Sequence, residues 1–166
     1  MSLLISIPIL AVLAIIQSVV LSNIPLLLGT IDVVLVVLLA WALQDRVQTA
    51  WQWSLIGGGF MTILSGLPPG VYLAGYFGAT LMARYIRRRI WKLPFLGMLT
   101  ATFLGTLVVL SASWLARWMT GVYIPPGSGL ILIVLPSLLL NLLITVPVFY
   151  IMKELSNRLY PKEIEV

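Results

Sequence analysis

The amino-acid sequence consists of long uncharged apolar stretches, between which one dense basic cluster stands out. Five of the ten Lys and Arg residues lie within nine positions, at Arg84, Arg87, Arg88, Arg89 and Lys92. The hydrocarbon core of a bilayer excludes charge, so an apolar run of about 20 residues is typical of a membrane span. A short basic loop between two spans stays in the cytoplasm. The sequence therefore predicts an integral membrane protein whose basic loop faces the inside of the cell.

The composition excludes several classes of function. The chain is 61% hydrophobic and 9% charged, whereas soluble domains are typically about 25% charged. It contains no Cys and no His, which removes thiolate chemistry, disulfides and the commonest general base and metal ligand. We therefore expect no catalytic residues, no metal and no cofactor. The net charge of +5 lies mainly at the ends of apolar runs, so we expect it to meet anionic lipid head groups and not nucleic acid.

The apolar runs predict an all-α polytopic membrane helix bundle that forms one domain over residues 1–166. A 40-residue apolar stretch at the start is too long for one helix, and Asn23 and Pro25 divide it into two spans. The segment Leu67-Pro68-Pro69-Gly70 predicts a rigid turn between the third and fourth spans. The six predicted transmembrane helices cover about 3–22, 25–43, 51–66, 70–86, 93–117 and 130–152.

The distribution of charge predicts the orientation of these spans. Six crossings place four regions on the same side of the membrane, namely both termini, loop 44–50 and loop 84–92. These regions hold nine Lys and Arg residues, and the other side holds only Arg117. This bias places the basic side and both termini in the cytoplasm. Aromatic belts are expected at the two interfaces, formed on the inside by Trp51, Trp53 and Trp91 and on the outside by Trp114, Trp118 and Tyr123.

Small residues recur at a spacing of four along spans three to five, which predicts close helix packing because lipid supplies no hydrophobic drive for association. Candidate packing residues are Gly58, Thr62 and Gly66 on span three, and Gly97, Ala101 and Gly105 on span five. Span four has two adjacent small faces, more than one neighbour needs. One of them is therefore a candidate surface for a partner helix, with Gly70, Ala74, Gly75, Gly78 and Ala79 as its residues.

Two polar residues lie inside the predicted spans. Asp32 is the only acid placed within a span, and an intramembrane carboxylate is costly enough that a function is the default hypothesis. Three roles stay open for it: a structural hydrogen bond to a helix N-terminus, a partner contact, or a proton or ligand site. Asn141 in span six is expected to join helices by hydrogen bonds. The basic cluster is expected to meet anionic lipid, with an acidic cytoplasmic partner as the alternative.

From Gly29 to Gly70 the chain resembles the rod shape-determining protein MreD family of bacteria. The matching elements are Ile31-Asp32 before an apolar span, Trp41 to Arg46 at its end, Gly57 to Phe60, and the Gly-x-Pro-x-Gly-like turn at 64–70. The family usually has Pro where this chain has Ile31. It commonly has an acid where this chain has Thr62, so a role for that second acid does not carry over.

The resemblance implies a non-enzymatic scaffold of the elongation machinery (the elongasome) in the bacterial cytoplasmic (inner) membrane, which supports peptidoglycan synthesis and cell shape. The implied partners are an MreC-like single-span protein, a RodA-type glycosyltransferase and a class B penicillin-binding protein. The implied fold is that of the substrate-binding subunits of energy-coupling-factor transporters. The alternative is a vitamin-binding transporter subunit with an outward pocket near Asn23, Asp32, Tyr72, Tyr76 and Tyr123.

Overall fold

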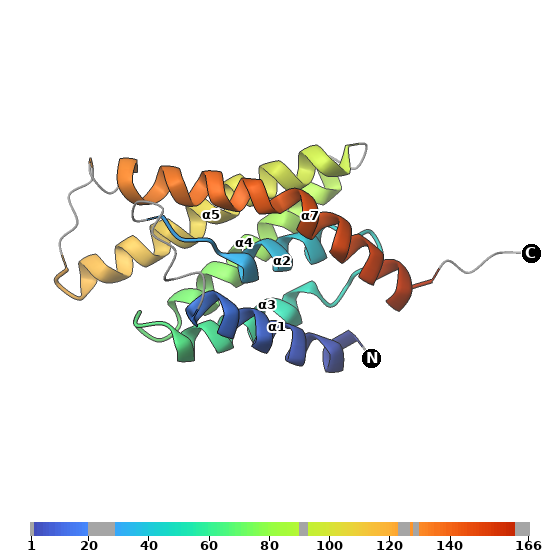
Figure 1. The fold of residues 1–166 in the computed structure, drawn as a ribbon, viewed down its shortest axis with the longest axis horizontal. Coiled ribbons are helices and arrows are strands. Elements are labelled where there is room, and N and C mark those ends of the chain that lie inside the picture. Colours follow the sequence, from blue (N-terminus) through green and yellow to red (C-terminus); the bar gives the residue numbers. More distant parts are fainter. Residues whose placement is uncertain (1, 20–28, 90–92, 123–126, 128–129, 162–166) are drawn as a thin grey trace, which may run out of the picture.

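A computed structural model describes residues 2–19, 29–89, 93–122, 127 and 130–161. These ranges form an all-α structure, which confirms the predicted class (Figure 1). Its elements are α1 (Ser2–Val19), α2 (Val33–Ala42), α3 (Ala50–Leu64), α4 (Val71–Arg89), α5 (Pro94–Met119), a π-helical turn η2 (Leu130–Val134) and α7 (Leu135–Leu159). Most of the predicted helical ranges agree with these bounds to within a few residues.

Helix α2 lies at the centre of the bundle, where it contacts α1, α3, α4, α5 and α7 (Figure 1). All of its residues from Val34 to Ala42 are buried. A helix that is apolar on every face is stable only when other helices surround it. The remaining helices pack in pairs around it, with α4 against both α3 and α5, α1 against α3, and α5 against α7.

The predicted second span, 25–43, is wrong in its helical extent. The helix begins only at Val33 and has 10 residues, which is about 15 Å of helix against a hydrocarbon core of about 30 Å. Residues 29–32 are not helical and add at most about 13 Å of chain. Residues 20–28, which hold Asn23 and Pro25, lie outside the described ranges.

Within the described ranges, two helical stretches are long and apolar enough to cross a membrane, Pro94–Met119 and Ile131–Leu159. At 1.5 Å per residue, each exceeds the thickness of a hydrocarbon core. The second stretch joins η2 to α7 and runs past residue 152. The charged tail therefore continues the last helix, which agrees with the spacing of four residues between Leu155 and Leu159, because residues at that spacing share one face of a helix.

The two ends of the bundle differ in what they carry. Figure 1 shows the start of α1 and the end of α7 at one end, together with the C-terminal ends of α2 and α4. At this end Arg46 donates a hydrogen bond to the carbonyl oxygen of Tyr160, 2.9 Å away. The opposite end holds the start of α2, the turn at 65–70 and the end of α5. Successive helices therefore run back and forth between two ends.

Trp53 does not lie in an interfacial aromatic belt, contrary to the prediction. Its side chain is fully buried and stacks on Trp41, with ring centroids 4.4 Å apart and an interplanar angle of 25°. Trp51, Trp114 and Trp118 are exposed at the ends of their helices, while Trp91 and Tyr123 lie outside the described residues. The buried pair joins α2 to α3, because aromatic side chains contribute large contact areas.

Two of the predicted small residues allow especially close helix contacts. A Cβ at Gly58 would lie 2.8 Å from the Cα of Leu73 in α4, and one at Gly105 would lie 2.8 Å from Cδ1 of Leu39 in α2. Gly97 and Ala101 are buried on the same helix as Gly105. Gly66 is a wrong prediction, because it follows the end of α3 and has nothing within 4 Å of its Cβ position.

Candidate functional site: a buried polar network around Asp32

Asp32 ends the non-helical segment and begins α2 as its N-cap. Its φ and ψ are −108° and 77°, and its Oδ1 accepts a hydrogen bond from the backbone N–H of Leu35 at 2.9 Å. Asp is among the preferred N-cap residues because its side chain satisfies one of the free N–H groups of the first turn. The acid therefore determines where α2 starts.

The same carboxylate oxygen joins two further helices. Gln17 of α1 donates to it from Nε2 at 3.1 Å, and the hydroxyl of Tyr76 in α4 donates at 2.6 Å. Tyr76 is fully buried and Asp32 is 9% exposed. Burying a polar group is unfavourable unless hydrogen bonds replace its hydration, and here three donors from three elements converge on Oδ1.

Side chains from other helices also satisfy the backbone of the non-helical segment. The N–H of Thr30 donates to Oγ of Ser137 at 3.0 Å, and the N–H of Asp32 donates to Oδ1 of Asn141 at 2.8 Å. In the first turn of α2, which follows this segment, the N–H of Val34 donates to Oε1 of Gln17 at 3.0 Å. In a membrane, non-helical backbone is tolerated only where protein or a cavity surrounds it. Helices α1 and α7 supply that surrounding here.

The network continues along the contact between α5 and α7. Asn141 donates from Nδ2 to the hydroxyl oxygen of Thr106 at 3.1 Å. The hydroxyl of Thr145 lies 3.1 Å from that of Thr102 and 2.7 Å from the carbonyl oxygen of Asn141. These side chains are all buried. The network, which we call the Asp32 network, thus joins α1, α2, α4, α5 and α7.

Of the three roles left open for Asp32, the structure shows the hydrogen bond at a helix N-terminus. The expected hydrogen bond between Asn141 and a neighbouring helix is confirmed. The proton or ligand role and the partner contact of Asp32 stay predictions. Tyr76 was named only as a pocket residue of the transporter alternative, and the sequence pattern did not single out three further network members, Gln17, Thr106 and Ser137. The spacing of four that relates Ser137, Asn141 and Thr145, and also Thr102 and Thr106, is the signal that could have revealed this polar stripe.

The two small faces of α4 have different surroundings. Gly75 and Ala79 are buried, and a Cβ at Gly75 would contact Val109 of α5 at 3.4 Å. Their candidacy for partner binding is therefore wrong, because α5 already occupies that face. The other face is accessible: Ala74 is exposed, and a Cβ at Gly78 would meet only Val108 at 4.0 Å. Gly70, with φ of +91°, has open space around its Cβ position.

The basic cluster separates into two kinds of residue. Arg87 does not simply face lipid, because its guanidinium donates to the carbonyl oxygens of Gln44 at 2.6 Å and of Ala42 and Val47 at 3.3 Å. It thereby joins α4 to the last residue of α2 and to the segment that follows it, and free carbonyl groups at a helix C-terminus favour a cation. Burial lowers the pKa of Arg87, and nearby Arg84 lowers it further, while Asp45 opposes both effects.

The rest of the cluster keeps its predicted position at the surface. Arg88 and Arg89 are exposed and Arg84 is half-buried. Arg89 lies over the ring of Tyr85, 5.6 Å from its centroid. Lys92 lies outside the described residues. The exposed cations remain available for head groups.

The Asp32 network holds helices in place, and its donors and acceptors bind one another. Asp32 and Tyr76, two of the groups that the transporter alternative would offer to a ligand, are bonded together. In the ranges that the structure describes, no group of three His, Cys, Asp or Glu side chains could hold a metal ion. Comparison with protein families, with curated proteins and with solved structures found no match to this chain.

Proposed function

We propose that this chain is an MreD-like, six-span membrane scaffold of the bacterial cell-elongation machinery. In this proposal it lies in the cytoplasmic membrane with both termini inside, and has the fold of an energy-coupling-factor substrate-binding subunit. It binds an MreC-like single-span protein, with a RodA-type glycosyltransferase and a class B penicillin-binding protein as further partners. Its task is to hold these partners together during lateral cell-wall synthesis, and it catalyses no reaction itself.

One observation carries the scaffold proposal: α4 has a second small face that no helix in the described ranges covers closely. Gly75 and Ala79 pack inside the chain, whereas Ala74 and Gly78 lie on the accessible face. In a bilayer, small residues allow the backbone of another helix to approach closely, and this close packing drives association. A single-span partner could therefore lie along Gly70, Ala74 and Gly78.

The charge distribution supports the proposed orientation. Figure 1 shows the end of α4 and the end of α7 at the bundle end that carries both described termini, and the end of α5 at the other end. Arg88 lies in the last turn of α4 and Lys153 in the last third of α7, whereas Arg117 lies in the last turn of α5. Large apolar side chains such as Leu143 of α7, which is 74% exposed, cover the outside of the helices. Such a surface is suited to lipid contact.

The orientation can be tested by cysteine labelling, because the natural chain contains no cysteine. Val122→Cys lies beyond the end of α5 and Gln48→Cys lies between α2 and α3, and both side chains are exposed. We expect a membrane-impermeant maleimide to label Val122→Cys in intact cells, and Gln48→Cys only after the membrane is permeabilised. Labelling of Gln48→Cys in intact cells would contradict the proposed topology.

The partner surface can be tested by filling the open face of α4. We expect Ala74→Leu combined with Gly78→Leu to reduce co-purification with a co-expressed MreC-like protein at least about tenfold, because the added side chains prevent close backbone approach. Gly59→Leu on α3 is the matched control, because its Cβ position has nothing within 4 Å. The control should retain the partner. An undiminished complex with the double variant would refute the docking surface.

A further inference from the structure

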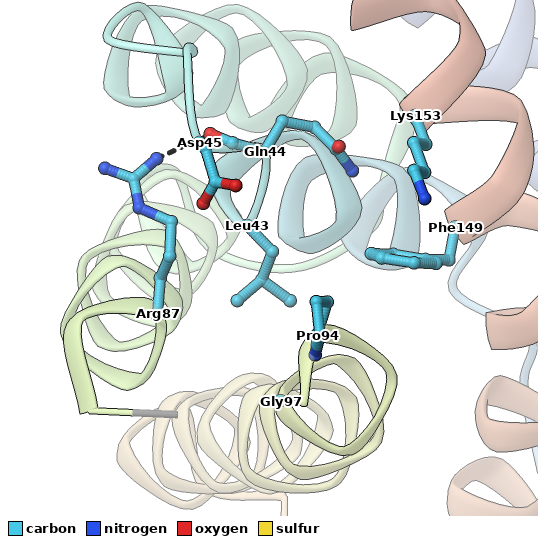
Figure 2. Close-up of a pocket in the computed structure, with 8 residues that line it drawn as sticks. All are labelled: Leu43, Gln44, Asp45, Arg87, Pro94, Gly97, Phe149 and Lys153. Atoms are coloured by element: carbon cyan, nitrogen blue, oxygen red, sulfur yellow. Dashed lines mark hydrogen bonds between the residues drawn. The ribbon is translucent and has the colours of Figure 1, made fainter. Parts of the chain in front are cut away.

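A small cavity opens at the basic end of the bundle, where four elements meet. It has a volume of about 140 Å³ and lies between the C-terminal end of α2, α4, the start of α5 and the last third of α7 (Figure 2). Engineered cavities of about this size admit a molecule as large as benzene. Its lining includes Asp45, Arg87, Pro94, Phe149 and Lys153.

The lining of this cavity has charges of both signs. In Figure 2 the amino group of Lys153 extends from α7 beside Phe149, and the carboxylate of Asp45 points toward the cavity from the segment after α2. Among the described residues, neither Lys153 nor Asp45 belongs to an ion pair within 4.0 Å. Arg87 adds a third charge, which three backbone carbonyl groups hold in place. The side chains of Lys153 and Asp45 are therefore available to a ligand.

The arrangement matches a group that combines a phosphate with a hydrogen-bond donor. A Lys ammonium group binds phosphate as a point charge, while a carboxylate only accepts hydrogen bonds and so requires a donor. A simple inorganic anion would pair with Lys153 but would leave the carboxylate of Asp45 without a donor. Phe149 and Pro94 supply an apolar wall, against which the carbon atoms of a larger ligand could pack.

We propose that this cavity binds the head group of a phospholipid that carries an N–H or O–H donor, such as phosphatidylethanolamine or phosphatidylglycerol. The phosphodiester contacts Lys153 and the donor of the head group contacts Asp45. This inference depends on the membrane placement in the proposed function, but not on any protein partner. This binding differs from the attraction of anionic lipids to the exposed Arg88 and Arg89. That attraction depends on the net charge of the lipid and does not require a hydrogen-bond donor on its head group.

The test uses the purified full-length chain in detergent, with lipid binding followed by native mass spectrometry. Phosphatidylethanolamine, phosphatidylglycerol and phosphatidylcholine are titrated separately, because the last has a phosphate but no donor on its head group. We expect the first two to bind at least about tenfold more tightly than phosphatidylcholine, as a charge-assisted hydrogen bond predicts. Equal binding of all three lipids would overturn the proposal. Preference for phosphatidylglycerol alone would instead indicate attraction by net charge and would also overturn it.

Two variants assign the contacts. Lys153→Ala should weaken the binding of all three lipids about tenfold, whereas Arg158→Ala is the matched control. Arg158 is an exposed cation of the same helix, pairs with Glu154 at 2.9 Å and does not line the cavity. Asp45→Ala should abolish the preference for donor-bearing lipids and leave phosphatidylcholine unchanged. If Lys153→Ala behaves like Arg158→Ala, the site is wrong. None of these results depends on a scaffold partner, so the two proposals can fail separately.

Discussion

Replacing Asp32 with alanine is expected to lower the free energy of unfolding by about 3 kcal/mol. The substitution removes the N-cap of α2 and the acceptor of Gln17 and Tyr76. The hydroxyl of Tyr76 would remain inside the bundle without its acceptor, since this residue is fully buried. A buried donor that has lost its partner costs about 1–3 kcal/mol, and loss of an N-cap adds about 1 kcal/mol.

The loss can be measured by unfolding the purified protein in mixed detergent micelles and following tryptophan fluorescence. The stacked Trp41 and Trp53 are fully buried, so their emission should change when the bundle opens. Gln48→Ala is the control, because Gln48 is exposed between α2 and α3 and should change stability by less than about 0.5 kcal/mol. Asp32→Asn retains one oxygen acceptor and should fall between the two. Equal stability of Asp32→Ala and Gln48→Ala would show that the network does not support the bundle.

Adding one methyl group at adjacent glycines of α3 is expected to have opposite effects. Gly58→Ala should destabilise the protein by about 1–3 kcal/mol, as overpacking does. Its new Cβ would lie 2.8 Å from Cα and 3.3 Å from N of Leu73, and these backbone atoms can move only with α4. Gly59→Ala should instead stabilise it by up to about 1 kcal/mol, because alanine favours a helix more than glycine does and open space surrounds this position.

This pair of variants isolates the contact between α3 and α4, because both substitutions make the same chemical change in the same helix. The same unfolding measurement in micelles applies to them. Stabilisation by Gly58→Ala would contradict the close approach of the two helices. A larger side chain at the same position, Gly58→Leu, should prevent accumulation of folded protein, whereas Gly59→Leu should still accumulate.

Much of the helical arrangement could be predicted because its causes are local. Apolar runs of sufficient length predicted α1, α3, α4 and α5 close to their observed bounds, whereas α7 runs on to Leu159, beyond the predicted end at residue 152. Pro68 and Pro69 separate α3 from α4, and Pro94 occupies the first turn of α5, where proline is tolerated. Asp32 and Asn141 could also be singled out, because a polar residue in an apolar run needs a partner within the protein.

The partners themselves could not be predicted, because they come from distant parts of the chain. Tyr76 and Asp32 are 44 residues apart, and the backbone of Asp32 bonds to a side chain 109 residues away. The same limit applies to Arg87, whose position in a basic run indicated lipid contact. Its carbonyl partners lie 40 to 45 residues earlier in the chain.

The sequence by itself determined that the chain is all-α and where most of its helices lie, because hydropathy and helix-breaking residues act over a few neighbouring positions. Only the tertiary structure decided that α2 is short, that Asp32 caps its start, and which small face of α4 stays accessible. The physical reason is that residues 29–32 can remain non-helical only where Ser137 and Asn141 satisfy their backbone. Likewise, α5 covers Gly75 and Ala79 through contacts that no local pattern encodes.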